Sequence, residues 1–287
     1  AIALEMAHYL EGIGREVTVI QRSPHVLSGS DPDLAEALEG AFVERGITLY
    51  TGTKLTGASK SAELKEIQFE HEGETKTASA AEILFALGRV PATAGLGLDQ
   101  AGVELEGRQV RADSGQATTS PHIFAAGDVC GPYEVVHIAI EQGEVAATNA
   151  AARLGKVPAE GVREIDYRLK LFGVFTEPQV ATVGMGEVEA KAAGVEHLVA
   201  TYPFDDHGKS MTMGETHGFV KLLCRPDGEL IGGAVVGPEG AELIHEIAVA
   251  MAFRSTAADL ARIPHYHPTL SEIWTYPAED LAEQTRG

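Results

Sequence analysis

Cysteine is scarce in this sequence, since 287 residues include only Cys130 and Cys224. The two lie far apart and form neither a CxxC pair nor part of a metal-ligand cluster, so we expect no disulfide framework and no metal site. Free cysteine is among the residue types most often buried, and we expect each to act as a small apolar residue. If the protein carries out thiol chemistry, its redox cysteines lie elsewhere.

Basic residues are also few: 22 Lys and Arg stand against 42 Asp and Glu, a formal net charge of -20. This balance argues against binding nucleic acid or an anionic membrane through a general basic surface, although a single pocket can still be basic. No apolar run is long enough to span a bilayer, and no signal peptide is visible. We therefore expect no membrane partner and a cytoplasmic location.

Apolar residues are plentiful at 44%, which allows substantial cores, and the length favours two or three domains. The first part alternates helical and strand patterns in "AIALEMAHYL", "REVTVIQRS" and "SDPDLAEALEGAFVERGITLYTGT", the last predicting a capped amphipathic helix and a strand. This order predicts a parallel sheet with right-handed crossovers. We expect an α/β fold that begins in a truncated Rossmann-like nucleotide-binding domain, without the strand that precedes its first helix.

The end of the strand in "REVTVIQRS" bears on the choice of nucleotide. NAD-binding domains place an acidic residue there to accept hydrogen bonds from the adenosine ribose, whereas a 2′-phosphate requires a cation. Here the neutral Gln21 is followed by Arg22, with His25 close behind. Arg22 can donate a charge-assisted contact to a phosphate, or it can be an ordinary solvated arginine. We expect NADP in preference to NAD and keep both open.

Two further apolar stretches, "AAEILFALGRVP" and "TSPHIFAAGDVCG", predict strands that end at Gly88-Arg89 and at Gly127-Asp128. A carboxylate just past a buried strand can accept a hydrogen bond from a ribitol or ribose hydroxyl, and the adjacent glycine lets a ligand approach the backbone. The helical pattern in "VVHIAIEQGEVAATNA" could direct its N-terminal amides at an anion. The same pattern is also compatible with a plain buried helix.

Near the C-terminus, "HYHPTLSEI" allows two interpretations. In the first, a loop leads into a helix that Thr269 or Ser271 caps, with Glu272 in the first turn. In the second, His267 is a proton-transfer base that Glu272 orients and stabilises in its charged form. Capping arrangements are commoner than catalytic dyads, so the local pattern alone favours the first.

The chain resembles the flavoprotein disulfide reductases, also called pyridine nucleotide-disulfide oxidoreductases. The matching segments follow the family order and span nearly the whole chain: "AIALE", "ALGRVP", "TTSPHIFAAGDV", "FTEPQVATVG", "GFVKLL", "LIGGAVVGPEGAELI" and "HYHPTLSEI". The resemblance implies a homodimeric FAD-dependent enzyme that transfers electrons between NADP (or NAD), flavin and a disulfide or dithiol. The family's N-terminal FAD-binding half and its redox-active CxxxxC are absent from this sequence, so we expect the isolated chain to be inactive.

The resemblance also implies roles for single residues. His267 would be the acid/base that reaches the redox disulfide of the other subunit, Glu272 would hold it, and His265 would be supporting structure. Asp128 would bind the flavin ribitol. The remaining expected cofactor contacts are the backbone at Val136 and His137 beside the flavin pyrimidine edge, Glu5 beside the nicotinamide and flavin, Gly88 and Arg89 in a loop near the cofactor, and Arg22 on the 2′-phosphate, with Gln21 departing from the acidic residue of NAD-dependent members.

The "HYHPTLSE" run is closest to the dihydrolipoamide dehydrogenase pattern within the family, which favours a small disulfide or dithiol, or a lipoyl-carrying protein, as substrate. The alternatives are a mercuric or glutathione reductase-like enzyme, or a redox-inactive dimerisation fragment. A metal-ion substrate is disfavoured because mercuric reductases usually replace the histidine with tyrosine and end in a cysteine pair.

We expect three segments: a truncated NAD(P)-binding domain (1–89), a return segment of the FAD-binding domain (90–163), and an α+β interface, or dimerisation, domain with an antiparallel sheet (164–287). In the last, "GFVKLLCRPDGELIGGAVVG" predicts a hairpin around Pro226-Asp227-Gly228, and "AELIHEIAVAMAFRS" predicts an amphipathic helix.

Overall fold

The computed structural model describes residues 1–61 and 63–286. The chain divides into two compact units, a larger unit of residues 1–86 and 171–287 and a smaller unit of residues 87–170. The divisions fall after residues 86 and 170, whereas the expected boundaries are at 89 and 163. The first and third expected segments share the larger unit, and the three-domain assignment itself stays a prediction.

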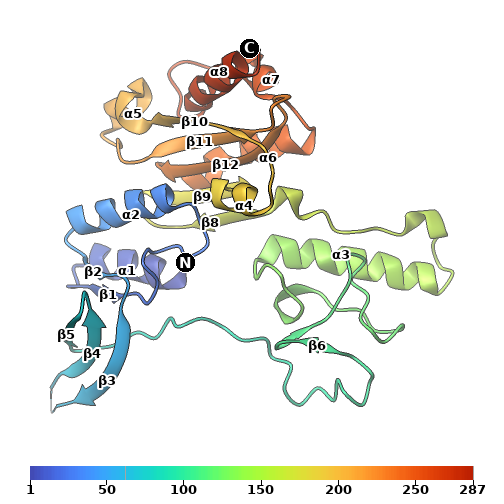
Figure 1. Cartoon of the computed structure of the whole chain (residues 1–287), viewed down its shortest axis with the longest axis horizontal. Helices are drawn as coiled ribbons and strands as arrows, with labels where there is room; N and C mark the ends of the chain where they lie inside the picture. The colour runs from blue at the N-terminus through green and yellow to red at the C-terminus, as the bar shows by residue number, and fades with distance from the viewer. Residues whose placement is uncertain (62, 287) are drawn as a thin grey trace. The chain divides into compact units, whose positions relative to one another are not determined.

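The larger unit begins with the expected alternation of helices and strands (Figure 1). Its first elements are α1 (Ile2–Gly12), β1 (Thr18–Ile20), α2 (Pro32–Glu44) and β2 (Thr48–Tyr50). Strands β1 and β2 pair in parallel, with Thr18 opposite Thr48, which confirms the predicted parallel pairing. An antiparallel sheet of order β3-β4-β5 follows, formed by β3 (Lys54–Lys60), β4 (Lys65–His71) and β5 (Glu74–Ala80).

A second, five-stranded antiparallel sheet forms most of the C-terminal part of the larger unit, in the order β10-β11-β12-β9-β8. Its strands are β8 (Leu171–Val174), β9 (Gln179–Gly184), β10 (Leu198–Pro203), β11 (Phe219–Cys224) and β12 (Leu230–Gly237). The helices among them are α4 (Glu187–Ala192), α5 (Gly208–Met213), α6 (Gly240–Ala252), α7 (Ala257–Arg262) and α8 (Thr275–Gln284). The fold is therefore mixed α/β with an antiparallel sheet, as expected.

The predicted hairpin joins β11 to β12. Arg225 N donates to Glu229 O at 2.9 Å, and Gly228 N donates to Arg225 O at 2.8 Å, which closes the turn. Gly228 has a φ of +89°, a left-handed conformation that glycine adopts without steric cost. The predicted amphipathic helix is α6, whose Leu243, Ile244 and Ile247 are buried.

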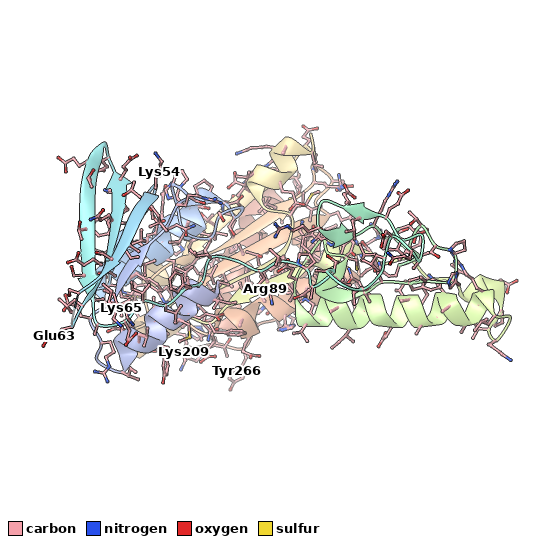
Figure 2. The ribbon with its side chains drawn as sticks, turned by 90° about the horizontal axis from the view of Figure 1, so that it is seen from below. Lys54, Glu63, Lys65, Arg89, Lys209 and Tyr266 are labelled. Atoms are coloured by element: carbon pink, nitrogen blue, oxygen red, sulfur yellow. The ribbon has the colours of Figure 1, made fainter. Side chains whose placement is uncertain are left out.

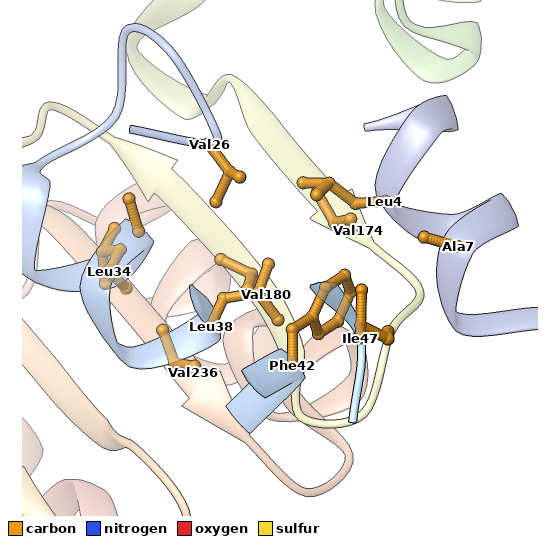
Figure 3. Packing of buried hydrophobic residues seen from close by; sticks show 12 residues of the cluster. Leu4, Ala7, Val26, Leu34, Leu38, Phe42, Ile47, Val174, Val180 and Val236 are labelled. Atoms are coloured by element: carbon orange, nitrogen blue, oxygen red, sulfur yellow. The ribbon is translucent and has the colours of Figure 1, made fainter. Parts of the chain in front are cut away.

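One apolar core joins the N-terminal elements to the C-terminal sheet. Leu34, Leu38 and Phe42 lie four residues apart on α2 and so share one face of that helix. In Figure 3 this face lies against Val180 and Val236 of the antiparallel sheet. Phe42 and Leu38 are fully buried, and each such side chain contributes about 1.5–3 kcal/mol by leaving water.

A buried ion cluster reinforces this junction. Lys221 on β11 is 1% exposed, and its Nζ lies 3.2 Å from Asp31 Oδ2 and 2.9 Å from Glu187 Oε1. Asp33 completes the cluster. The expected cap on α2 is therefore wrong in one respect: Asp31 stands at the N-cap position, but its carboxylate accepts hydrogen bonds from the Glu187 and Val188 amides, at 3.0 and 2.9 Å, and so caps α4.

The smaller unit is built around one long helix, α3 (Val136–Arg153). Ile138 and Val145 of α3 form a small core with Ile165, and Tyr133 and Tyr167 pack against it. The other elements are β6 (Leu105–Glu106), β7 (Gln109–Val110), and the 3-10 turns η1 (Gly127–Val129), η2 (Ala159–Gly161) and η3 (Tyr167–Leu169).

Two predicted strands are not formed. Residues 82–90 have no strand, and the stretch before Gly127 makes only the isolated bridge between Ala117 and Phe124. A strand requires a row of hydrogen bonds to a neighbour. The segment before Gly127 makes two around its bridge, Thr118 N to Ile123 O and Ala125 N to Gln116 O, each 3.0 Å long, and residues 82–90 pair with no strand among residues 1–61 and 63–286. Phe85 and Leu87 are 76% and 77% exposed, so the apolar pattern that suggested a buried strand is not buried within this chain.

Candidate functional site

The C-terminal segment holds His267 beside Glu272. Its 3-10 turn η5 (Ser271–Trp274) is anchored by the fully buried Ile273 and Trp274, and Trp274 Nε1 donates to Leu243 O at 3.2 Å. The capping interpretation is wrong, because the N-cap residue is Leu270 and no side chain caps the turn. Instead, His267 Nδ1 lies 2.8 Å from Glu272 Oε2.

The two side chains of this pair have opposite exposure. The His267 side chain is 79% exposed, whereas that of Glu272 is 10% exposed. A carboxylate can only accept a hydrogen bond, so the proton of neutral His267 resides on Nδ1 and the Nε2 lone pair points away from Glu272. This arrangement can accept a proton at Nε2 and stabilise the resulting imidazolium through the carboxylate.

The other histidine of the motif, His265, is held inside the fold by contacts to both of its ring nitrogens. His265 Nε2 lies 2.6 Å from Glu246 Oε1, its Nδ1 lies 2.9 Å from Ile263 O, and the side chain is 7% exposed. Both ring nitrogens are therefore occupied. Tyr266, between the two histidines, projects outward from the larger unit and is 83% exposed (Figure 2).

A third histidine lies at this site, and no sequence pattern predicted it. His207, which precedes α5, is fully buried, and its Nε2 lies 3.4 Å from Glu272 Oε1. Its Nδ1 lies 2.8 Å from Ser210 Oγ. Burial lowers the pKa of His207 below its usual value despite the nearby Glu272 carboxylate, so the ring is neutral near pH 7. The run "DDHGKS" contains no motif that relates it to "HYHPTLSEI", so the sequence does not predict that His207 and Glu272 meet.

The loop between β1 and α2 contains the residues expected to choose the nucleotide. Gln21 continues the backbone pairing of β1, since its amide donates to Tyr50 O at 2.7 Å. Glu39 of α2 organises the loop by accepting from Val26 N at 2.8 Å and by contacting His25 Nδ1 at 3.3 Å. Arg22 is exposed and makes no ion pair with the described residues, so its guanidinium is available to a ligand.

Glu5 lies on α1, and its Oε1 accepts a hydrogen bond from Phe175 N at 3.1 Å. The contact connects α1 to the turn between β8 and β9. Glu5 is thereby held in place while Phe175 beside it remains 65% exposed.

In the smaller unit the structure brings Arg89 and Asp128 together. Arg89 Nη1 lies 3.3 Å from Asp128 Oδ2, and its Nη2 lies 3.1 Å from Glu134 Oε2. All three side chains are at least partly exposed, so the carboxylate of Asp128 retains access to solvent. Gly88, just before Arg89, has a φ of +104°, a conformation that favours glycine.

A buried glutamine shapes the turn that carries Asp128. Gln142 of α3 accepts from Gly127 N at 2.6 Å and donates to Gly131 O at 2.6 Å and to the Tyr167 hydroxyl at 2.7 Å. Gly127 has a φ of +78°, and a Cβ there would lie 3.4 Å from the Ala139 side chain. The turn therefore presents Asp128 on a rigid base close to the start of α3.

Helix α3 begins at the two positions expected to face a flavin. Val136 and His137 are both exposed, and no side chain caps this end of the helix. The first amides of an 18-residue helix are thus open to an acceptor, at the positive end of its dipole.

Neither thiol fits a redox role. Burial raises the pKa of Cys130, and burial together with Asp227 raises the pKa of Cys224 to about 11. Both groups are therefore protonated near neutral pH, and a thiol is a poor nucleophile. Residues 1–61 and 63–286 contain no cluster of His, Cys, Asp and Glu arranged to hold a metal ion. Within the same residues no helix is both long and apolar enough to cross a membrane.

Comparison with known proteins decides the family. Residues 1–143 match the pyridine nucleotide-disulphide oxidoreductase family, and residues 172–278 match the dimerisation domain of the same family. The chain belongs to the pyridine nucleotide-disulphide oxidoreductases. This confirms the resemblance drawn from the sequence motifs.

Similar members of the family include dihydrolipoyl dehydrogenases. That of Mycobacterium tuberculosis strain H37Rv is 35% identical over 274 residues, which are 95% of this chain and 58% of the relative. That of Thermus scotoductus is 34% identical over 288 residues, which are 99% of this chain and 60% of the relative. The chain therefore spans about three fifths of the length of these relatives.

Solved structures of similar proteins have the same fold. The crystal structure of LpdA from Mycobacterium tuberculosis superposes with a TM-score of 0.84 at 32% identity, covering 97% of this chain and 59% of that one. The HOCl-induced flavoprotein disulfide reductase RclA from Escherichia coli has a TM-score of 0.81 at 24% identity, covering 97% of this chain and 62% of that one, and shows the fold alone.

Membership of this family implies FAD and a pyridine nucleotide, and the residues of the smaller unit fit a flavin. Asp128 is a solvent-accessible carboxylate on a glycine-containing turn, which suits a ribitol hydroxyl. The uncapped start of α3 at Val136 and His137 offers amide donors to a polar ring edge. These are the groups that would hold FAD on this chain.

Proposed function

We propose that the protein carrying this chain is an FAD-dependent NAD(P)H-disulfide oxidoreductase of the dihydrolipoamide dehydrogenase type. The observation that carries the proposal is the His267 Nδ1 to Glu272 Oε2 contact at 2.8 Å, which leaves Nε2 exposed as a base. Relatives of 34–35% identity over nearly the whole chain support the substrate class, a lipoyl dithiol or a lipoyl-carrying protein.

In the proposed reaction, His267 Nε2 accepts the proton of a substrate thiol. The resulting thiolate sulfur forms a bond to one sulfur of the redox disulfide, whose S–S bond breaks and leaves its electron pair on the departing sulfur. In the reverse direction the imidazolium returns the proton to a leaving thiolate. Glu272 favours the charged form of His267 in both directions. When bound, FAD would carry electrons between the disulfide and the nicotinamide.

The redox disulfide belongs to residues other than these, because Cys130 and Cys224 are protonated thiols without a partner cysteine. The proposal therefore concerns the complete protein, and this chain by itself is proposed to be redox-inactive.

We also propose that the protein is a homodimer that prefers NADPH to NADH. Residues 172–278 match a dimerisation domain, and α6 and α7 border an apolar groove of about 570 Å³. Val249 and Phe253 in this groove are 58% and 81% exposed, which suits a surface that a second subunit covers. The free Arg22 guanidinium supports the choice of the 2′-phosphate.

The test compares two histidines in the complete protein. His267→Ala should leave flavin reduction by NAD(P)H nearly unchanged and lower dithiol turnover about 10²-fold or more, the scale of a lost general acid/base. The matched control is His217→Ala, because His217 is also an exposed histidine beside a glutamate, with Nε2 3.4 Å from Glu44 Oε2. Equal turnover in both variants would overturn the proposal.

A further inference from the structure

Glu272 is contacted by two histidines, one at each carboxylate oxygen. Oε2 lies 2.8 Å from Nδ1 of the exposed His267, and Oε1 lies 3.4 Å from Nε2 of the buried His207. His207 and Glu272 come from segments far apart in the sequence, and both are buried. A buried carboxylate needs donors to both oxygens, and within the described residues His207 is the side chain that faces the second one.

The hydrogen-bond chain selects one tautomer of His207. Its Nδ1 lies 2.8 Å from Ser210 Oγ, and a serine hydroxyl can either donate or accept. If Nδ1 carried the proton, the Nε2 lone pair would face the Glu272 carboxylate, which is repulsive. Ser210 therefore donates to Nδ1, and the Nε2 proton points at Glu272. Nε2 forms no hydrogen bond with any of the residues described, and Glu272 Oε1, an ion-pair contact at 3.4 Å, is the acceptor that a small shift of either side chain would bring into hydrogen-bond geometry.

We propose that His207 is a positioning residue for the acid/base pair, holding the Glu272 carboxylate by Nε2–H so that the opposite oxygen stays aligned with His267. The inference rests on the proposed function of His267. It extends the pair to a chain of four groups, Ser210, His207, Glu272 and His267, in which each of the first three fixes the orientation of the next. The exposed His267 ring depends on this chain because it has little packing of its own.

The competing explanation is that His207 only fills space. Its ring makes edge contacts to Phe204 and Tyr276, with centroids 6.4 Å apart in each case. A packing role depends on the volume of the side chain at position 207 and does not depend on its polar atoms. A positioning role depends on a donor at the place of Nε2. Variants that separate volume from donor capacity therefore distinguish the two.

The experiment uses the complete FAD-loaded protein with dihydrolipoamide as probe. His207→Leu removes the donor, and we expect kcat for dithiol oxidation to fall about 10-fold with KM and flavin reduction by NAD(P)H unchanged, the scale of a lost hydrogen bond to a charged group. His207→Gln places an amide N–H near the position of Nε2 and should stay within about 3-fold of the original protein. If Gln is as impaired as Leu, the proposal is overturned.

A double-mutant cycle supplies the second readout. If His207 acts through Glu272, His207→Leu should cost less than about 2-fold in kcat once Glu272→Ala is present, because the two changes share one effect. If the two losses multiply, His207 acts independently of Glu272 and the inference fails.

A third readout does not depend on turnover and separates this inference from the proposed function. In protein labelled with ¹⁵N-histidine, the Nδ1–H resonance of His267, assigned by its loss in His267→Ala, should be protected from exchange and shifted downfield. It should broaden or disappear in His207→Leu and weaken in Ser210→Ala, which keeps the ring and is the fallback if the Leu variant does not fold. An unchanged resonance in both variants overturns the inference. Normal dithiol turnover in His267→Ala would instead overturn the proposed function.

Discussion

Replacing Lys221 with methionine should destabilise the larger unit by about 3 kcal/mol, because breaking one side of a buried ion pair leaves an uncompensated charge. Asp31, 4% exposed, bears this cost. It keeps its hydrogen bonds from the Glu187 and Val188 amides, which places the expected value at the low end of the usual range. Glu187 and Asp33 are 27% and 42% exposed and can be solvated instead.

The effect should depend on pH in a definite direction. Burial alone would raise the pKa of Asp31 and of Glu187, but hydrogen bonds from the Val188 and Glu187 amides to Asp31, and Lys221 acting on both carboxylates, hold each pKa below its usual value. A depressed carboxylate pKa stabilises the fold above the unfolded pKa, near 4, and this stabilisation is lost as the pH falls through the folded pKa. The deficit of Lys221→Met should therefore be full at neutral pH and shrink below about pH 4.

The assay is urea unfolding of the chain, followed by the fluorescence of Trp274, the sole tryptophan and a fully buried one. The matched control is Lys54→Met, which removes an exposed pair with Glu70 at 3.3 Å and should cost under about 1 kcal/mol. Figure 2 shows Lys54 on the surface of the β3-β4-β5 sheet. Equal losses in the two variants, or a Lys221→Met deficit that does not shrink in acid, would show that the buried Lys221 cluster does not contribute this stability.

Three further outcomes are expected. Phe42→Ala should cost about 3–5 kcal/mol in the same unfolding assay, because Phe42 is fully buried in the shared core; a loss below about 1 kcal/mol would mean that this core is misplaced. Arg22→Ala in the complete enzyme should raise KM for NADPH far more than KM for NADH, and equal changes in steady-state assays would remove Arg22 from the nucleotide site. Cys224, with a pKa of about 11, should resist iodoacetamide at pH 8 in the folded protein and react once urea unfolds it, as followed by mass spectrometry; rapid labelling of folded protein would contradict its burial.

Local patterns predicted those elements whose neighbours are present in the chain. The amphipathic helix α2, with its 3.6-residue apolar repeat, and the turn at Gly228 could both be predicted because each depends on residues close in sequence. The expected strand around Phe85 was wrong because its formation depends on a partner strand, which the local sequence does not show. An apolar run shows that a segment seeks burial, but a strand also needs a partner, and a pattern in one segment contains no information about its neighbours.

In the candidate site, too, contacts between distant segments could not be predicted from local sequence patterns. The local pattern around His267 and Glu272 favoured a capped loop and only the family resemblance favoured the pair, which the structure forms with His267 Nδ1 2.8 Å from Glu272 Oε2. His207 comes close to Glu272 only when the five-stranded sheet and α5 have folded, so no local sequence pattern predicts this contact. The side-chain cap expected for α2 is not formed, and only the tertiary structure shows that the Asp31 carboxylate is directed to α4 and Lys221.

The most direct test of the proposed role of His267, which the family resemblance predicts to act across a subunit interface, is complementation between inactive subunits of the complete protein. Subunits carrying His267→Ala are mixed with subunits whose redox cysteines are replaced by serine, and dithiol oxidation is measured after exchange. Each heterodimer is expected to have one intact active site and about half the normal turnover, since the other site lacks both groups. Heterodimers that form and show no activity above either parent would contradict it.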